Sequence, residues 1–127
     1  MTDDEKFERG VDDFNAGRFF EAHEIWEELW LAAAETEKTF LQGLIQVTAA
    51  FHHHARGNAR GRQSLLEAGL AKLAECPDDF RGAAIGQLRR ELENWRGEPG
   101  AEEQLDPRSP PKIRPVKSNT HKKKRGG

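Results

Sequence analysis

The chain has 127 residues, a formal net charge of −2 at pH 7 and one cysteine, Cys76. One cysteine excludes an internal disulfide, and the sequence shows neither an apolar leader nor a run of about 18 apolar residues that would predict a membrane helix. A chain of this length is expected to fold as one domain. We therefore expect a soluble, cytoplasmic protein without a membrane partner.

Acidic and basic side chains are distributed unevenly along the chain. Residues 1–105 hold 21 acidic and 12 basic side chains, whereas residues 106–127 hold one acidic and eight basic side chains. The basic end could contact nucleic-acid phosphates weakly, and a solubilising tail or one that docks on the acidic body is the simpler interpretation. The residues that would make the phosphate contacts are Lys122, Lys123, Lys124 and Arg125.

Composition also predicts a domain boundary. Over residues 98–127 prolines and glycines accumulate, and apolar residues become too rare to offset the entropy of ordering the chain. We predict a helical domain over residues 1–97, followed by a largely disordered linker and basic tail. In an alternative, Ile113 and Val116 hold residues 110–116 against the helical domain.

Five helices are predicted in chain order from apolar residues at helical spacing. Thr2 and Glu5 have the spacing of a capping box, which starts a first helix that ends near Asn15. Thr36 is the expected N-cap of the third helix. The remaining helices are expected over residues 18–34, 37–56 and 59–75, and around Ile85, Leu88, Leu92 and Trp95.

Strand signals are weak, because the chain has no tyrosine, few β-branched residues and no alternating run of useful length. Residues 78–80 are expected to lie in the connection before the last helix. The sequence therefore predicts an all-α fold, a single bundle or array of about five helices.

Polar residues of the second predicted helix fall on two faces. Successive residues advance by about 100° around a helix, so His23 and Glu27 lie on one side, close to the apolar face centred on Trp26. The acidic residues Glu21, Glu24 and Glu28 fall on the opposite face, where solvent explains them.

The third predicted helix carries a row of polar residues opposite Leu44. Gln42, Gln46 and His53 recur at helical spacing among small residues, whereas the neighbouring His52 and His54 point elsewhere. If the second helix packs against this row, one polar pocket forms from two helices. Its candidate residues are His23, Glu27, Gln42, Gln46 and His53, with Trp26 and Trp30 beside them.

Three interpretations of this polar cluster remain open. The groups could satisfy one another as a structural network, bind a small molecule or ion without chemistry, or hold a metal for hydrolysis. His23-Glu24-Ile25-Trp26-Glu27 begins like the zincin signature H-E-x-x-H, but its fifth position is glutamate, and residues 14–56 contain no serine, cysteine or aspartate nucleophile.

The sequence thus favours a small-ligand-binding or interaction module without catalytic residues or cofactor. The alternatives are a metal-dependent hydrolase using His23 and Glu27, with His53 as a further weak candidate ligand, and a protein that associates weakly with nucleic acid through its tail.

Three motifs resemble one known family. They are F-N-x-G-x-F-F-E-A-H-E-x-W-E-E-x-W from Phe14, then F-L-Q-G-L-I-Q-x-x-A-A-x-H, then G-N-x-x-G. Together they are similar to the pattern of the domain-of-unknown-function family numbered 309. The resemblance implies a small bundle of about five helices, found in bacteria, archaea and plastid-bearing organisms, without an established activity. The motif positions that match here are His23, Glu24, Glu27, Trp30, Gln42, Gly43, Gln46 and His53.

Overall fold

The computed structural model describes residues 1–96 and 110–116, and it confirms the predicted all-α class. The small two-stranded hairpin before the last helix is an addition to that prediction. In chain order the elements are α1 (Asp3–Asn15), α2 (Phe19–Ala32), α3 (Glu35–Ala55), α4 (Ala59–Leu73), β1 (Asp79–Phe80), β2 (Ala83–Ala84) and α5 (Ile85–Arg96).

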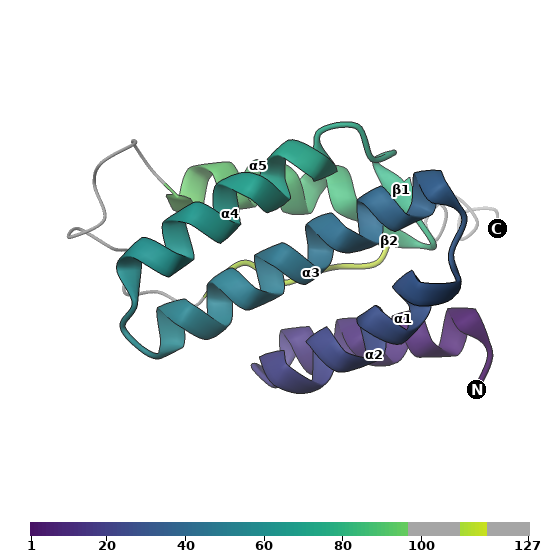
Figure 1. The fold of residues 1–127 in the computed structure, drawn as a ribbon. Helices are drawn as coiled ribbons and strands as arrows, with labels where there is room; N and C mark the ends of the chain where they lie inside the picture. The colour runs from purple at the N-terminus through teal and green to yellow at the C-terminus, as the bar shows by residue number, and fades with distance from the viewer. Residues whose placement is uncertain (97–109, 117–127) are drawn as a thin grey trace, which may run out of the picture.

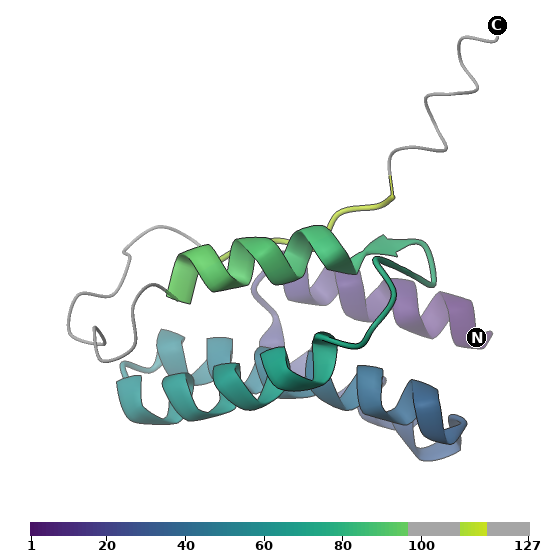
Figure 2. The same cartoon turned by 90° about the horizontal axis from the view of Figure 1, so that it is seen from above.

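The helices form two layers. Figures 1 and 2 show α2, α3 and α4 side by side in one layer, with α3 in the middle, and α1 and α5 in the other layer. The main helix pairs in contact are α1 with α2, α2 with α3, and α3 with α4. Two faces of α3 are therefore covered by different helices, and this division decides where its polar residues lie.

The helix ends follow local chemistry. The capping box of Thr2 and Glu5 is present at the start of α1, and the Asn58 side chain caps α4. Gly17 and Gly57 end α1 and α3 with φ of 82° and 78°, a conformation that glycine adopts without strain. The prediction of Thr36 as an N-cap is wrong: α3 begins at Glu35, and Thr36 lies within its first turn.

The core is centred on Trp26, whose side chain is fully buried. Its ring lies 5.9 Å from that of Phe7 and 6.1 Å from that of Phe14, and Phe14 in turn lies 5.2 Å from Phe51. Trp26 Nε1 donates a hydrogen bond of 3.3 Å to the Phe7 carbonyl. α1 reaches this ring because Gly10 has no side chain: a Cβ there would lie 2.6 Å from Trp26 Cδ1.

Residues 78–80 lie in the connection between α4 and α5, as expected, but this connection contains two strands that the sequence does not predict. Asp79 pairs with Ala84 and Phe80 with Ala83 in a hairpin of two-residue strands, too short to produce an alternating sequence pattern. Both turn residues have positive φ, 53° for Arg81 and 84° for Gly82, as a type I′ turn requires.

Arg81 ties this hairpin to two helices. Its guanidinium donates to Asp4 of α1 at 2.7 Å and to Glu37 of α3 at 2.9 and 3.1 Å. The hydrogen bond to Glu37 raises the pKa of Arg81 above its ordinary value.

Residues 110–116, called the strap below, lie against the bundle. Ile113 is 2% exposed and belongs to the hydrophobic core. The alternative in which Ile113 holds residues 110–116 against the helices is therefore the one that the structure shows. The predicted disorder at residues 98–109 and 117–127 falls outside the described residues, and so do the basic residues near the C-terminus.

Within the ranges that the structure describes, no helix has both the length and the apolar character needed to cross a membrane.

Candidate functional site

A small pocket lies between the N-terminal half of α2 and the C-terminal half of α3. Its volume is about 170 Å³. We call it the histidine pocket, and its lining residues are Phe19, Phe20, His23, Thr48, Ala49, His52 and His53. The antiparallel packing of α2 on α3 forms it, because this pairing brings the start of one helix beside the end of the other.

His23 and Glu27 are neighbours on α2, as their spacing predicts. His23 Nε2 lies 3.7 Å from Glu27 Oε2, and both side chains are partly exposed. This separation is longer than a well-formed hydrogen bond, so the pair contributes little to stability. The carboxylate nevertheless favours a proton on Nε2, which leaves Nδ1 of His23 as an acceptor.

His53 is oriented from the turn between α3 and α4. Asn58 Oδ1 accepts a hydrogen bond from the Gly61 amide at 3.0 Å, which directs the amide nitrogen of Asn58 at His53 Nδ1, also 3.0 Å away. Because the amide nitrogen can only donate, Nδ1 accepts, and the proton of the neutral imidazole lies on Nε2. His53 is thus prepared as a hydrogen-bond donor.

The two glutamines do not line the histidine pocket. Gln42 is exposed, and Gln46 is half-buried with an Oε1 that has no hydrogen-bond partner within the described part of the chain. Gly43, between them in sequence, packs on α4: a Cβ there would lie 3.0 Å from Leu73 Cγ. Gly43 therefore faces α4, and neither glutamine shares the histidine pocket with His23 and His53.

The two candidate tryptophans also lie outside the pocket. Trp26 points into the core between α1 and α2. Trp30 is half-buried further along α2, and Lys38 Nζ lies 4.7 Å above the centre of its ring. Helical spacing indicates a packing role for the tryptophans, and Trp26 has that role.

Sequence reasoning missed Phe19, Phe20, Thr48, Ala49 and His52 as lining residues. Phe20 is 60% exposed. Its position at the start of an otherwise acidic helix face is the sequence signal that could have indicated a surface pocket there. Thr48 gave no signal because its hydroxyl donates to the Leu44 carbonyl at 2.7 Å, a common arrangement in helices.

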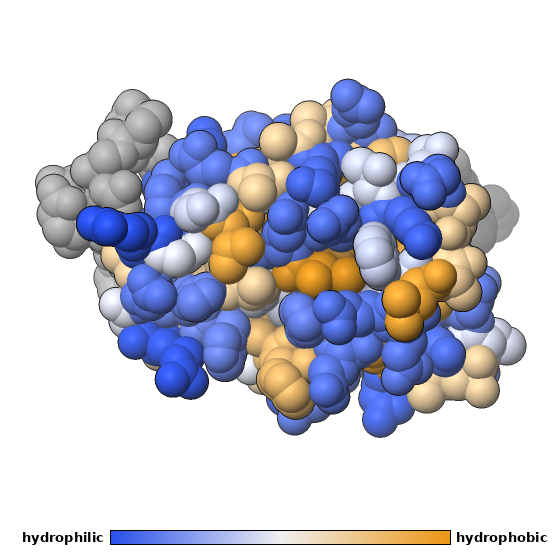
Figure 3. All heavy atoms as spheres, in the orientation of Figure 1, coloured by the Kyte–Doolittle hydropathy of each residue, from blue (hydrophilic) through white to orange (hydrophobic). Residues whose placement is uncertain are grey.

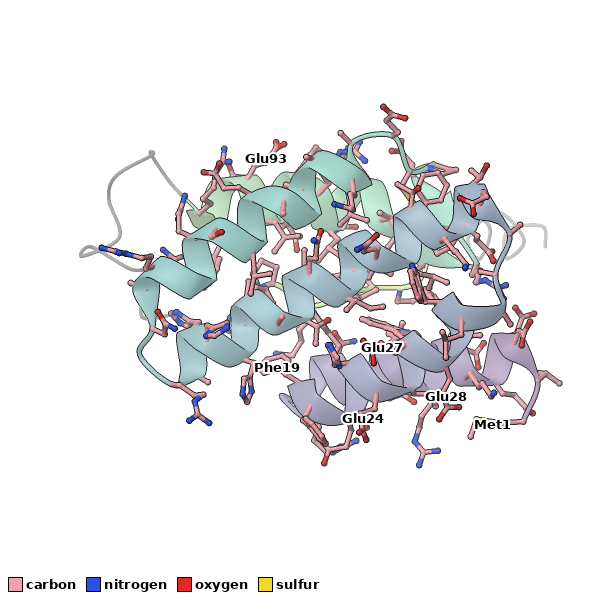
Figure 4. The ribbon with its side chains drawn as sticks, in the orientation of Figure 1. Met1, Phe19, Glu24, Glu27, Glu28 and Glu93 are labelled. Carbon is pink, nitrogen blue, oxygen red and sulfur yellow. The ribbon has the colours of Figure 1, made fainter. Side chains whose placement is uncertain are left out.

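The acidic residues of α2 lie as their angular positions predict. In Figure 4, Glu27 lies on the side of α2 nearest α3, whereas Glu24 and Glu28 lie on the side turned away from α3. Both are exposed, as is Glu21. These glutamates belong to the solvated surface of the bundle.

Figure 3 views the layer of α2, α3 and α4 from outside. Hydrophobic residues gather over α3, between hydrophilic side chains on the helices beside it. The histidine pocket interrupts the boundary between α2 and α3 on this layer. It is therefore open to solvent although its walls are largely apolar.

Within residues 1–96 and 110–116, no three histidine, cysteine or carboxylate side chains are grouped so that they could hold a metal ion. Burial raises the pKa of the Cys76 thiol to about 12, so its reactive thiolate form is suppressed.

These features describe a small helical bundle with a pocket between two antiparallel helices. Residues 7–65 match the model of the family described as Domain of unknown function (DUF309). The predicted resemblance to this family is confirmed over these residues. The match runs from α1 into α4, so it includes every residue of the histidine pocket.

Two relatives are described as uncharacterized proteins. One, from Aquifex aeolicus (strain VF5), is 39% identical over 85 residues, which are 66% of this chain and 26% of the relative. The other, YpuF from Bacillus subtilis (strain 168), is 39% identical over 56 residues, which are 42% of this chain and 32% of the relative. The matched part of the chain thus spans about a quarter to a third of each relative.

Proposed function

We propose that the chain is a non-enzymatic binding module whose histidine pocket holds a small, largely apolar ligand. The observation that carries the proposal is a cavity walled by aromatic and aliphatic side chains, with imidazoles contributed by two helices. Its volume of about 170 Å³ is below the roughly 300–1,000 Å³ typical of pockets for drug-sized molecules. The pocket therefore suits one ring or a short aliphatic group and is too small for a nucleotide or flavin.

Hydrogen bonding narrows the class of ligand. Asn58 leaves His53 Nε2 as a donor, and Glu27 favours His23 Nδ1 as an acceptor. A neutral ligand with a donor and an acceptor at one end, such as an amide or a nitrogen heterocycle, complements this pair. Glu27 lies beside His23 but outside the pocket lining, and its negative charge disfavours a carboxylate ligand.

The lining of the pocket supports binding without catalysis. It contains no serine, cysteine or carboxylate, and the one hydroxyl, on Thr48, donates to a backbone carbonyl. A reaction by nucleophilic attack or by carboxylate acid-base chemistry would need a group that these residues do not supply.

Ala49→Leu tests the proposal because the larger side chain fills the pocket from the α3 wall. Ala71→Leu, on an exposed position of α4, is the matched control. Imidazole, pyridine, phenol and benzamide would be titrated to millimolar concentration against the wild type and both variants, with binding followed by NMR chemical shifts.

We expect at least one probe to shift the His23 and His53 signals of the wild type. Ala49→Leu should weaken that binding at least tenfold, and Ala71→Leu should leave it unchanged. Two results would each overturn the proposal: no probe binds the wild type, or Ala49→Leu binds as well as the control.

A further inference from the structure

The strap is held in a groove between α1 and β2 by hydrogen bonds to its backbone. The Asn15 carboxamide donates to the Ile113 carbonyl and accepts from the Ile113 amide, both at 2.8 Å. On the other side, the Ala84 amide donates to the Arg114 carbonyl at 2.8 Å. The Val116 amide donates to the Gly82 carbonyl at 3.0 Å. These hydrogen bonds all involve backbone atoms of the strap, so they recognise an extended backbone whatever its side chains are.

The strap forms an isolated antiparallel β-bridge with β2 of the two-stranded hairpin. Pro115 is antiparallel to Ala83, and the hydrogen bonds of their neighbours flank the pair. In such a pair the two facing residues exchange no hydrogen bonds of their own, so proline fits although it has no N–H. Asn15 supplies the two hydrogen bonds that a neighbouring strand would otherwise supply. This is the geometry by which sheet edges bind extended peptides.

Side chains add specificity to this backbone recognition. Ile113 is buried, and the cavity around it, of about 360 Å³, is lined in part by Phe7, Val11 and Ala83. Pro110 and Pro111 line a second cavity of about 260 Å³ together with aromatic residues of α1, α2 and α3. Proline restricts the backbone before binding, which lowers the entropy lost when the segment docks.

Charge favours a basic occupant of the groove. Glu8 and Asp12 of α1 line the cavity beside Arg114, and Arg114 Nη2 also lies 3.9 Å from Glu91 Oε2 of α5. The strap itself carries Lys112 and Arg114 and no acidic residue. An acidic peptide of the same shape would be repelled.

We propose that this groove is a binding site for an extended basic segment, and that a second copy of the chain supplies the segment when the molecule's own strap is displaced. A second copy carries a segment that already fits, and every contact would be the same in either arrangement. The 13 residues between Arg96 and Pro110 can extend over roughly 45 Å, enough to reach a neighbouring molecule.

Binding of a second copy's strap competes with binding of the molecule's own strap. A tethered segment has an effective concentration in the millimolar range, so the wild type keeps its own strap at micromolar concentration. The groove accepts a second copy once its own strap no longer fits.

Complementation between two full-length variants tests this inference. Ile113→Asp keeps the groove and disables the strap, whereas Asn15→Ala weakens the groove and keeps the strap. An equimolar mixture would be measured by analytical ultracentrifugation at several hundred micromolar. The matched control mixes Ile113→Asp with the double variant Asn15→Ala/Ile113→Asp, which has no intact strap. Urea unfolding checks that each variant is folded, and Ile113→Ala replaces Ile113→Asp if the latter does not unfold cooperatively.

We expect a one-to-one complex in the test mixture and monomers in the control mixture, in each single variant and in the wild type. A fluorescent peptide of residues 109–117 should bind Ile113→Asp at least tenfold more tightly than the wild type. A monomeric test mixture together with equal peptide binding by the two proteins would refute the inference. A complex that forms equally well in the control mixture would refute it too.

Discussion

Replacing Gly10 by alanine should destabilise the bundle, although alanine is the better helix former. A Cβ at this position would lie 2.6 Å from Trp26 Cδ1 and closer still to Nε1. Ordinary contact between such atoms is about 3.5 Å, so α1 must retreat from α2 by roughly 1 Å or the ring must turn. Trp26 is fully buried, which leaves the ring no free space.

The expected loss follows from two opposing terms. Overpacking a closed core destabilises by about 1–3 kcal/mol, and the rigid ring places this site near the upper value. Glycine to alanine in a helix stabilises by about 1 kcal/mol. The net loss in the free energy of unfolding should be about 2 kcal/mol, and it includes weakening of the hydrogen bond from Trp26 to the Phe7 carbonyl.

Urea unfolding followed by circular dichroism measures this loss. Comparing Glu8→Gly with Glu8→Ala, on the exposed side of α1, gives the helix-propensity term in the same helix. Trp26→Phe removes the indole nitrogen, so Gly10→Ala should be less harmful in that background than in the wild type. A Gly10→Ala protein as stable as the wild type, or more stable, would refute the close contact between α1 and α2.

Three further outcomes are expected. Gly69→Ala should lower the free energy of unfolding by about 2 kcal/mol in urea unfolding, since its Cβ would lie 2.8 Å from the backbone oxygen of Gly43, which cannot rotate away as a side chain can. Cys76 should resist alkylation at pH 8 until the chain unfolds. Burial raises the pKa of its thiol to about 12 in the folded chain, from an ordinary value of 9.0. The free energy of unfolding should therefore be unaffected by this thiol below pH 9 and should fall as the pH rises toward 12, because the unfolded chain ionises first. Cys76→Ala should reduce this fall in unfolding curves measured across that range. Arg81→Gln should lower stability by roughly 1–2 kcal/mol at low salt and by less at 1 M salt, because it removes the ion pair with Glu37; an equal loss at both salt concentrations would contradict an ionic origin.

Helix positions could be predicted from the sequence because each depends on residues close together in the chain. The capping box at Thr2 and the glycines at 17 and 57 fix the helix ends locally. The hairpin could not be predicted in this way. Each strand has only two residues, and Phe80 is buried by helices that are distant in sequence.

The pocket was predicted in part for a related reason. Angular positions on one helix place His23 beside Glu27, and they place His53 at the end of the polar row. They do not determine which neighbour covers each face of α3. The sequence pattern predicts that Gln42 and Gln46 share a pocket with His23. Neither glutamine lines the histidine pocket, and Gly43 between them packs on α4. A central helix with two partners divides its residues between them, and only the tertiary structure shows the division.

Asn15 and Ile113 are 98 residues apart in sequence, and this separation affects the order of events during synthesis. The ribosome completes both walls of the groove when β2 has been made, and the strap is still to come. At about 5–20 residues per second, translation from Ala84 to Ile113 takes roughly 1.5–6 s. The strap is therefore made after both walls of the groove. Its docking on Asn15 and β2 is a late step in the folding of the chain.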